Sequence, residues 1–176
     1  MRIISGKYKG KKFLPPSNLP VRPTTDYAKE SLFNILLNHF DFRNIQILDC
    51  FSGTGNLSFE FLSRGVQNVE SIDINFNCIA YQKTIKKELD LENFAPVQKD
   101  VFKVLKFISK SYDIIFSDPP YDLEGISKIP ELVFDNDLLS SGGWLIVEHS
   151  KKTVFRHPNY KETRKYGNVN FSIFSH

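Results

Sequence analysis

Residues 47–57 read ILDCFSGTGNL, and this stretch decides the fold of the chain. Its first residues are apolar, as in a buried strand, and Leu57 begins a stretch with the apolar spacing of a helix. Gly53 and Gly55 lie between the two, where residues without a Cβ let the backbone adopt positive φ and approach a ligand closely. A helix that begins at such a turn points its first N–H groups at the ligand. The stretch predicts a ligand-binding loop at the edge of an α/β sheet.

Short apolar runs alternate with helical stretches from residue 45 onward. We predict strands at 45–50, 68–72, 95–98, 112–117 and 144–148, and helices at 57–64, 77–91, 101–110 and near 130–139. This alternation favours a parallel sheet covered on both faces. The tail differs, because residues 159–165 and 169–174 flank a Gly167-Asn168 turn and predict an antiparallel hairpin. We therefore expect an α/β protein with the Rossmann-like sheet of class I S-adenosylmethionine methyltransferases, mostly parallel with a C-terminal antiparallel hairpin.

The N-terminal segment predicts a separate short β-hairpin arm. Ile3 and Ile4 precede a glycine-containing turn, and Phe13-Leu14 follow it before two prolines end the run. We call residues 1–23 the N-terminal arm and predict that residues 24–176 form a single compact methyltransferase domain. This domain would begin with a helix capped by one of the residues 24–26.

Three aspartates follow three successive predicted strands. Asp49 lies just before the glycine turn, and Asp73 and Asp100 end the second and third strands. In sheets of this type, ligands bind at the carboxyl ends of the strands, and an acid in the place of Asp73 hydrogen-bonds ribose hydroxyls. Asp49 would receive the ammonium group of a methionine moiety, and Asp100 the adenine amino group. Each aspartate alone could instead be a helix N-cap or a solvated loop residue.

The fourth predicted strand ends in Asp118-Pro119-Pro120-Tyr121. The two prolines stiffen the loop and remove backbone donors, so that the Asp118 carboxylate and the Pro119 carbonyl become neighbouring acceptors. An aromatic amino group is a poor nucleophile, and hydrogen bonds from both of its N–H bonds would favour a pyramidal nitrogen aimed at a methyl donor. Tyr121 would stack on the base through its ring face. We predict methyl transfer to an exocyclic amino group of a nucleic-acid base.

Positive charge is concentrated near the N-terminus, although the net charge is only +3. Such a concentration suits phosphate contacts, because each contact releases condensed counterions. A solvated surface that keeps the protein soluble is the alternative. The residues that we expect to contact RNA are Lys7, Lys9, Lys11, Lys12, Arg22 and Lys29.

The two cysteines, Cys50 and Cys78, fit neither a disulfide framework nor a metal-binding CxxC pair. We therefore expect no metal. The start of the chain lacks the apolar stretch of a signal peptide, and no run of eighteen apolar residues predicts a membrane span. A cytoplasmic protein without a membrane contact is the expectation.

Several motifs together resemble the bacterial RsmD family of 16S ribosomal RNA (guanine-N2) methyltransferases. They are RPTTD at residues 22–26, the residues Lys29-Glu30 and Leu32-Phe33-Asn34, DCFSGTG at 49–55, LSRG at 62–65 and DPPY at 118–121. Ser58 stands where a third small glycine would follow the turn. The resemblance implies methylation of the N2 amino group of a guanine in 16S rRNA, with free rRNA or the assembling small subunit as partner and the N-terminal arm on the RNA.

By position, the resemblance gives the cofactor role to Asp49, Gly53, Gly55, Asp73 and Asp100, and the target-base role to Asp118, Pro119 and Tyr121. Rival interpretations remain from the residues themselves. The same tetrad chemistry serves an adenine-N6 methyltransferase acting on DNA or RNA. A catalytically silent RNA-binding assembly factor is a second alternative, which the intact motifs oppose. A dinucleotide-dependent oxidoreductase would leave the Asp-Pro-Pro-Tyr motif without a role. No obligate protein partner is evident from the sequence.

Overall fold

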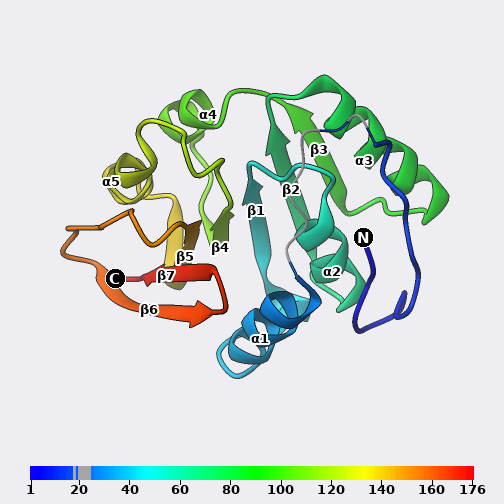
Figure 1. Cartoon of the computed structure of the whole chain (residues 1–176), viewed down its shortest axis with the longest axis horizontal. Helices are drawn as coiled ribbons and strands as arrows, with labels where there is room; N and C mark the ends of the chain where they lie inside the picture. Colours follow the sequence, from blue (N-terminus) through cyan, green and yellow to red (C-terminus); the bar gives the residue numbers. More distant parts are fainter. Residues whose placement is uncertain (18, 20–24) are drawn as a thin grey trace.

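In the part of the chain that the structure describes, seven strands form one sheet in the order β3-β2-β1-β4-β5-β7-β6 (Figure 1). This computed structural model describes residues 1–17, 19 and 25–176. The strands are β1 (Gln46–Cys50), β2 (Asn68–Asp73), β3 (Phe94–Gln98), β4 (Tyr112–Ser117), β5 (Leu139–His149), β6 (Tyr160–Tyr166) and β7 (Val169–Phe174). The α/β fold predicted from the sequence is confirmed.

The helices alternate with the first five strands. They are α1 (Asp26–Leu37), α2 (Asn56–Ser63), α3 (Phe76–Glu88), α4 (Val101–Phe107) and α5 (Ile129–Asp135), with single 3₁₀ turns η1 (Phe42–Asn44) and η2 (Ile126–Lys128). The Thr25 side chain caps α1 by accepting a hydrogen bond from the amide of Ala28 at 3.2 Å. Among the described residues, no helix is long and apolar enough to cross a membrane.

Strand direction determines where a ligand can bind. Strands β1 to β5 pair in parallel, whereas β7 runs antiparallel to both β5 and β6, which confirms the C-terminal hairpin. The chain winds outward from β1 to β3 and then returns to place β4 on the other side of β1. Such a reversal of strand order opens a crevice at the carboxyl ends of the two central strands.

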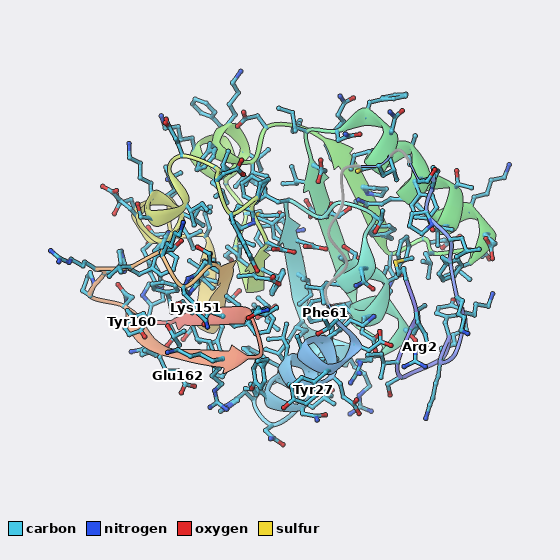
Figure 2. All side chains as sticks on the ribbon, viewed as in Figure 1. Arg2, Tyr27, Phe61, Lys151, Tyr160 and Glu162 are labelled. Atoms are coloured by element: carbon cyan, nitrogen blue, oxygen red, sulfur yellow. The ribbon has the colours of Figure 1, made fainter. Side chains whose placement is uncertain are left out.

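Apolar side chains cover the sheet on both faces. Ile47 of β1 belongs to a core that contains residues of α1 and α2, whereas its neighbour Leu48 belongs to a core that contains residues of α4 and α5. Phe61 of α2 lies in the first core, with its ring 4.6 Å from that of Phe33 of α1 (Figure 2). This packing fixes the carboxyl ends of the strands, because the strands are held from both sides.

The N-terminal arm forms the expected antiparallel hairpin, in a short form. Its two limbs pair at the bridge between Arg2 and Lys12, and backbone hydrogen bonds flank this bridge, such as that from the amide of Ile3 to the carbonyl oxygen of Lys11 at 3.0 Å. The amides of Ile4 and Ser5 donate instead to the carboxylate of Glu60 in α2, at 2.8 and 3.0 Å. Contacts with α2 therefore take up the two amides that follow Ile3, and the pairing of the two limbs does not continue past this point. The predicted domain boundary near residue 23 lies outside the described residues.

Candidate active site

A cavity of about 910 Å³ lies at the carboxyl ends of the central strands. Its wall combines the glycine loop after β1, the end of β2, the loop after β4, the end of β5 and part of the N-terminal arm. Of the predicted cofactor and target-base residues, the wall contains Asp49, Gly53, Asp73, Asp118, Pro119 and Tyr121. The structure thus brings together residues from the ends of three strands, β1, β2 and β4, that the sequence assigned to one site.

The glycine loop needs left-handed backbone at three positions. Phe51, Gly53 and Gly55 have φ of 57°, 52° and 78°. A Cβ at Gly55 would lie 2.8 Å from the ring of Phe59, so that a larger residue there would displace this ring. Gly55 itself is not part of the cavity wall and acts on the shape of the loop.

A buried glutamine, which the sequence analysis missed, fastens this loop to β2. The Nε2 of Gln82 donates to the carbonyl oxygen of Gly53 at 2.7 Å and to the Ser52 hydroxyl at 2.9 Å. Its Oε1 accepts from the hydroxyl of Ser71 in β2 at 2.6 Å. A polar residue on the inner face of α3 was the only signal for it in the sequence.

Asp49 is almost completely buried, with 2% of its surface exposed, and it borders the cavity. The Ser58 hydroxyl donates to its carboxylate at 2.5 Å. Burial raises the pKa of Asp49 to about 7, although the Ser58 hydrogen bond opposes this shift. The serine in the place of a third glycine therefore has a polar function, since it orients this carboxylate.

Asp73 and Asp100 have different surroundings. Asp73 accepts hydrogen bonds from the amides of Gly53 and Asn75, both at 2.8 Å, and so joins the glycine loop to the end of β2. Asp100 instead caps α4 by accepting from the amide of Lys103 at 3.0 Å. It is absent from the cavity wall. The structure therefore does not bring Asp100 to the other two acids, and the N-cap alternative describes its position.

The loop after β4 places Asp118 beside the glycine loop. The amide of Asp118 donates to the carbonyl oxygen of Cys50 at the end of β1 at 3.3 Å. The Tyr121 hydroxyl donates to Glu148 at the end of β5 at 3.0 Å. Glu148 was not among the predicted residues, although it too is an acid at the carboxyl end of a parallel strand, as the three predicted aspartates are.

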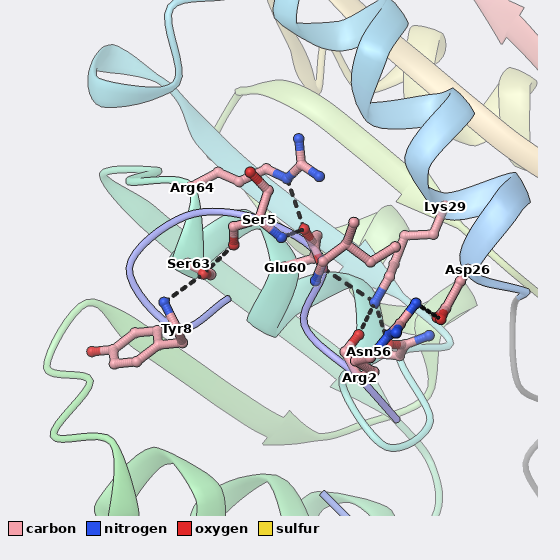
Figure 3. Close-up of polar contacts among 10 residues, drawn as sticks. Arg2, Ser5, Tyr8, Asp26, Lys29, Asn56, Glu60, Ser63 and Arg64 are labelled. Atoms are coloured by element: carbon pink, nitrogen blue, oxygen red, sulfur yellow. Dashed lines mark hydrogen bonds and ion pairs between the residues drawn. The ribbon is translucent and has the colours of Figure 1, made fainter. Parts of the chain in front are cut away.

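A buried polar network attaches the N-terminal arm to the same region (Figure 3). The Lys29 ammonium group of α1 lies 3.2 Å from the Glu60 carboxylate and donates to the carbonyl oxygen of Arg2 and to Asn56, the first residue of α2. Both Arg2 and Asn56 border the cavity. At Gly6, a Cβ would lie 1.8 Å from the carbonyl oxygen of Ser63, so that only glycine permits this close approach.

The prediction that Lys29 contacts RNA is wrong. Its side chain is 1% exposed and is held by the network, so that it cannot reach a phosphate. The side chains of Lys7, Lys9, Lys11 and Lys12 are exposed. The Nζ atoms of Lys7 and Lys11 lie 5.1 and 5.9 Å from the centroid of the Tyr8 ring. Lys12 also borders the cavity. Arg22 lies outside the described residues.

Within residues 1–17, 19 and 25–176, no cluster of side chains supports metal chemistry. No group of three or more His, Cys, Asp or Glu side chains in this part of the chain is arranged to hold a metal ion. Burial also raises the pKa of the Cys50 thiol, which keeps it protonated at neutral pH.

The fold and the cavity together define a class I methyltransferase. The defining features are the strand order, the antiparallel β7, and a cavity that the glycine loop and the Asp-Pro-Pro-Tyr loop share. Solved structures share this fold. The Escherichia coli protein yhhF is 27% identical, covers 99% of this chain and 96% of its own, and superposes with a TM-score of 0.86. SMU.776, solved in complex with SAH, is 18% identical, with a TM-score of 0.62 over 82% of this chain and 48% of its own.

Sequence comparison then gives the particular family. The family described as "Conserved hypothetical protein 95" matches residues 1–175. A relative named "Ribosomal RNA small subunit methyltransferase D", from Buchnera aphidicola subsp. Baizongia pistaciae, is 31% identical over 99% of this chain and 91% of its own length. The chain belongs to this family, and its resemblance to the RsmD family is confirmed.

Proposed function

We propose that this protein transfers a methyl group from S-adenosylmethionine to the N2 amino group of a guanine in small-subunit ribosomal RNA. The observation that carries the proposal is the cavity in which the glycine loop and the Asp-Pro-Pro-Tyr loop face each other. The name of the Buchnera relative supports the RNA substrate, and the SAH held by SMU.776 supports the cofactor. Because such a substrate is made in the bacterial cytoplasm, we also propose that the protein acts there.

The residues of the cavity suit S-adenosylmethionine. Its volume of about 910 Å³ lies within the range of about 300–1,000 Å³ that small-molecule sites occupy. Asp49 offers a carboxylate to an ammonium group, and Asp73 offers one to ribose hydroxyls at the end of β2. When bound, the cofactor supplies a methyl group attached to a positively charged sulfur. The sulfur is the leaving group and keeps the electrons of the broken C–S bond.

The Asp118 carboxylate and the Pro119 carbonyl accept hydrogen bonds from the two N–H groups of the target amino group. The lone pair of the nitrogen is thereby withdrawn from the ring and forms the new N–C bond to the methyl carbon. The nitrogen then loses one proton, which the Asp118 carboxylate takes up and releases to solvent. The catalytic effect is electrostatic and positional, since no residue of the chain becomes covalently modified. Tyr121 contacts the target base as a stacking platform.

Labelled methyl transfer tests this function. The protein is incubated with S-adenosylmethionine carrying a labelled methyl group and with small-subunit RNA that lacks the modification, either free or in partly assembled subunits. The RNA is digested to nucleosides, and the labelled position is mapped in the sequence. N2-methylguanosine at one position is the expected product, whereas labelled N6-methyladenosine or the absence of label in both substrates would overturn the proposal.

Asp49 should make cofactor binding depend on pH. Its pKa near 7 means that part of the carboxyl population is neutral at physiological pH, whereas an ammonium group binds the ionised form. We expect the affinity for S-adenosylmethionine to rise roughly 5- to 10-fold between pH 6 and 7.5, as protonation of one site predicts. Calorimetry at several pH values measures this. Asp49→Asn should bind weakly at every pH, and an equally steep dependence in that variant would remove Asp49 from the site.

The same pKa has a consequence for stability without ligand. An unfolded aspartate titrates near 3.8, so that between this value and about 7 the folded protein binds the additional proton. Stability falls with rising pH wherever the folded state binds more protons, and the contribution of Asp49 therefore decreases over this window.

The N-terminal arm is the proposed RNA contact. If its exposed lysines touch phosphates, changing all four to glutamine should weaken RNA binding and reduce the slope of log affinity against log salt by about 3, since each contact contributes roughly 0.7–0.9. Binding titrations at several salt concentrations measure the slope. The variant combines Lys7→Gln, Lys9→Gln, Lys11→Gln and Lys12→Gln.

A second variant controls for net charge alone. It changes four exposed lysines outside the arm, on α3, on α4 and between β3 and α4, namely Lys83, Lys87, Lys99 and Lys106, to glutamine. Equal slopes for the two variants would assign the arm lysines to a solvated surface. Cofactor affinity should be the same in both.

A further inference from the structure

Glu148 is a buried acid at the edge of the proposed target-base site. It is 4% exposed, lies one residue before the end of β5 and forms part of the cavity wall. Ser117 of β4 pairs with Val147 of β5, and these two parallel strands are neighbours in the sheet (Figure 1). Asp118 and Glu148 are the residues that follow this pair. The sheet therefore places two acids side by side at the carboxyl ends of β4 and β5.

The hydrogen bond from Tyr121 orients the carboxylate of Glu148. The Tyr121 hydroxyl donates to its Oε1 at 3.0 Å. A carboxylate has about four acceptor positions, so that Glu148 can accept from Tyr121 and from a ligand at the same time. The tyrosine thus has a polar role in addition to the ring face that the sequence analysis assigned to it.

The acceptors of the catalytic loop cannot by themselves choose the base. The exocyclic amino groups of guanine and adenine both present two N–H bonds to Asp118 and Pro119. The adjacent ring nitrogen differs, because N1 of guanine carries a hydrogen and donates, whereas N1 of adenine has a lone pair and accepts. A carboxylate beside the catalytic acceptors would bind the first and repel the second, and a site built to hydrogen-bond a group discriminates strongly against a base that lacks it.

We propose that Glu148 selects guanine by accepting the N1–H of the target base, while Tyr121 holds the carboxylate in place. This inference rests on the proposed function, because it presupposes that the cavity receives the target base. Glu148 then contacts the substrate without taking part in the transfer of the methyl group. It determines specificity, and the Asp118 loop performs the chemistry.

The test compares two bases at the mapped position of the substrate RNA. One RNA carries guanine there, and the other carries 2-aminopurine, which keeps the 2-amino group but has an acceptor at N1. Single-turnover rates of labelled methyl transfer are measured for both RNAs. We expect the wild-type protein to prefer guanine by about 10²-fold or more, and Glu148→Gln to reduce this preference at least 10-fold, because its amide can donate to the N1 of 2-aminopurine.

The preference is a ratio of two rates of one preparation, so a loss of folded protein leaves it unchanged. Tyr121→Phe should lower the preference in the same direction but less, and Glu131→Gln, an exposed change of the same kind on α5, should leave it unaltered. An equal decrease of both rates in Glu148→Gln, with N2-methylguanosine still the product, would overturn the role of Glu148 alone. N6-methyladenosine as the wild-type product would overturn both this inference and the proposed function.

Discussion

Replacing Asp118 with alanine should reduce the single-turnover rate of methyl transfer by at least about 10²-fold, while the affinity for S-adenosylmethionine changes little. The carboxylate acts mainly as the target nitrogen becomes pyramidal, so that its removal raises the barrier more than it weakens binding. Loss of one preorganised electrostatic group in a site of this kind typically costs about 10²–10³ in rate. Saturating cofactor and excess enzyme keep slow product release from hiding the chemical step.

Asp122→Ala is the matched control for this experiment. Asp122 is exposed on the same loop and is absent from the cavity wall, so that its replacement should leave the rate near that of the wild type. Calorimetry with S-adenosylmethionine checks that both variants retain the cofactor site. A near-normal rate for Asp118→Ala would contradict the proposed mechanism even if N2-methylguanosine were the product.

The sequence predicted those parts of the site whose conformation depends on residues close together in the chain. The bounds of β4 are the predicted ones, because an apolar run followed by two prolines is a local signal. The glycine loop formed as expected for the same reason. In contrast, β5 begins at Leu139, five residues before the predicted start. Its first half contains Ser140, Gly142 and Gly143, which lie at an irregularity in the pairing with β4, between Leu139 and Trp144. No apolar pattern predicts a strand there.

Long-range contacts explain what the sequence analysis missed. The prediction for Lys29 came from its place in the N-terminal concentration of positive charge, and lysines are mostly exposed. Its burial requires Glu60, which belongs to a different helix. The arm amides of Ile4 and Ser5 likewise reach a carboxylate more than fifty positions away in the chain. Such pairs leave no periodic signal, since neither partner predicts the position of the other.

The buried pair itself leads to the largest expected effect on stability. Glu60→Gln should lower the free energy of unfolding by about 3–5 kcal/mol at pH 7, the usual cost of leaving one charge of a buried pair uncompensated. The Glu60 carboxylate is 0% exposed and accepts from the arm amides and from Arg64 as well as lying beside Lys29. The substitution keeps the size of the side chain, so that the loss reports on charge and hydrogen bonding rather than on a cavity.

The dependence of this loss on pH identifies its cause. Burial lowers the pKa of Lys29 below 10.5, and Glu60 opposes that shift, so that the pKa should fall further in Glu60→Gln. Between the folded pKa and 10.5 the unfolded state binds more protons, and stability therefore rises with pH over this window. In the variant this pH window extends to lower pH, because the pKa of Lys29 is lower. We therefore expect the difference in stability between the variant and the wild type to be smaller at pH 9.5 than at pH 7.

Urea unfolding of the two proteins at both pH values measures this difference. Asp41→Asn is the control, because it breaks the exposed pair between Asp41 and Arg43, whose atoms lie 3.1 Å apart, and should cause no measurable change at either pH. Calorimetry with S-adenosylmethionine on the folded Glu60→Gln variant tests the connection to the site. We expect weaker binding, since the network holds Arg2 and Asn56 at the cavity wall. A loss of stability that is the same at both pH values would show that the uncompensated Lys29 charge is not its cause.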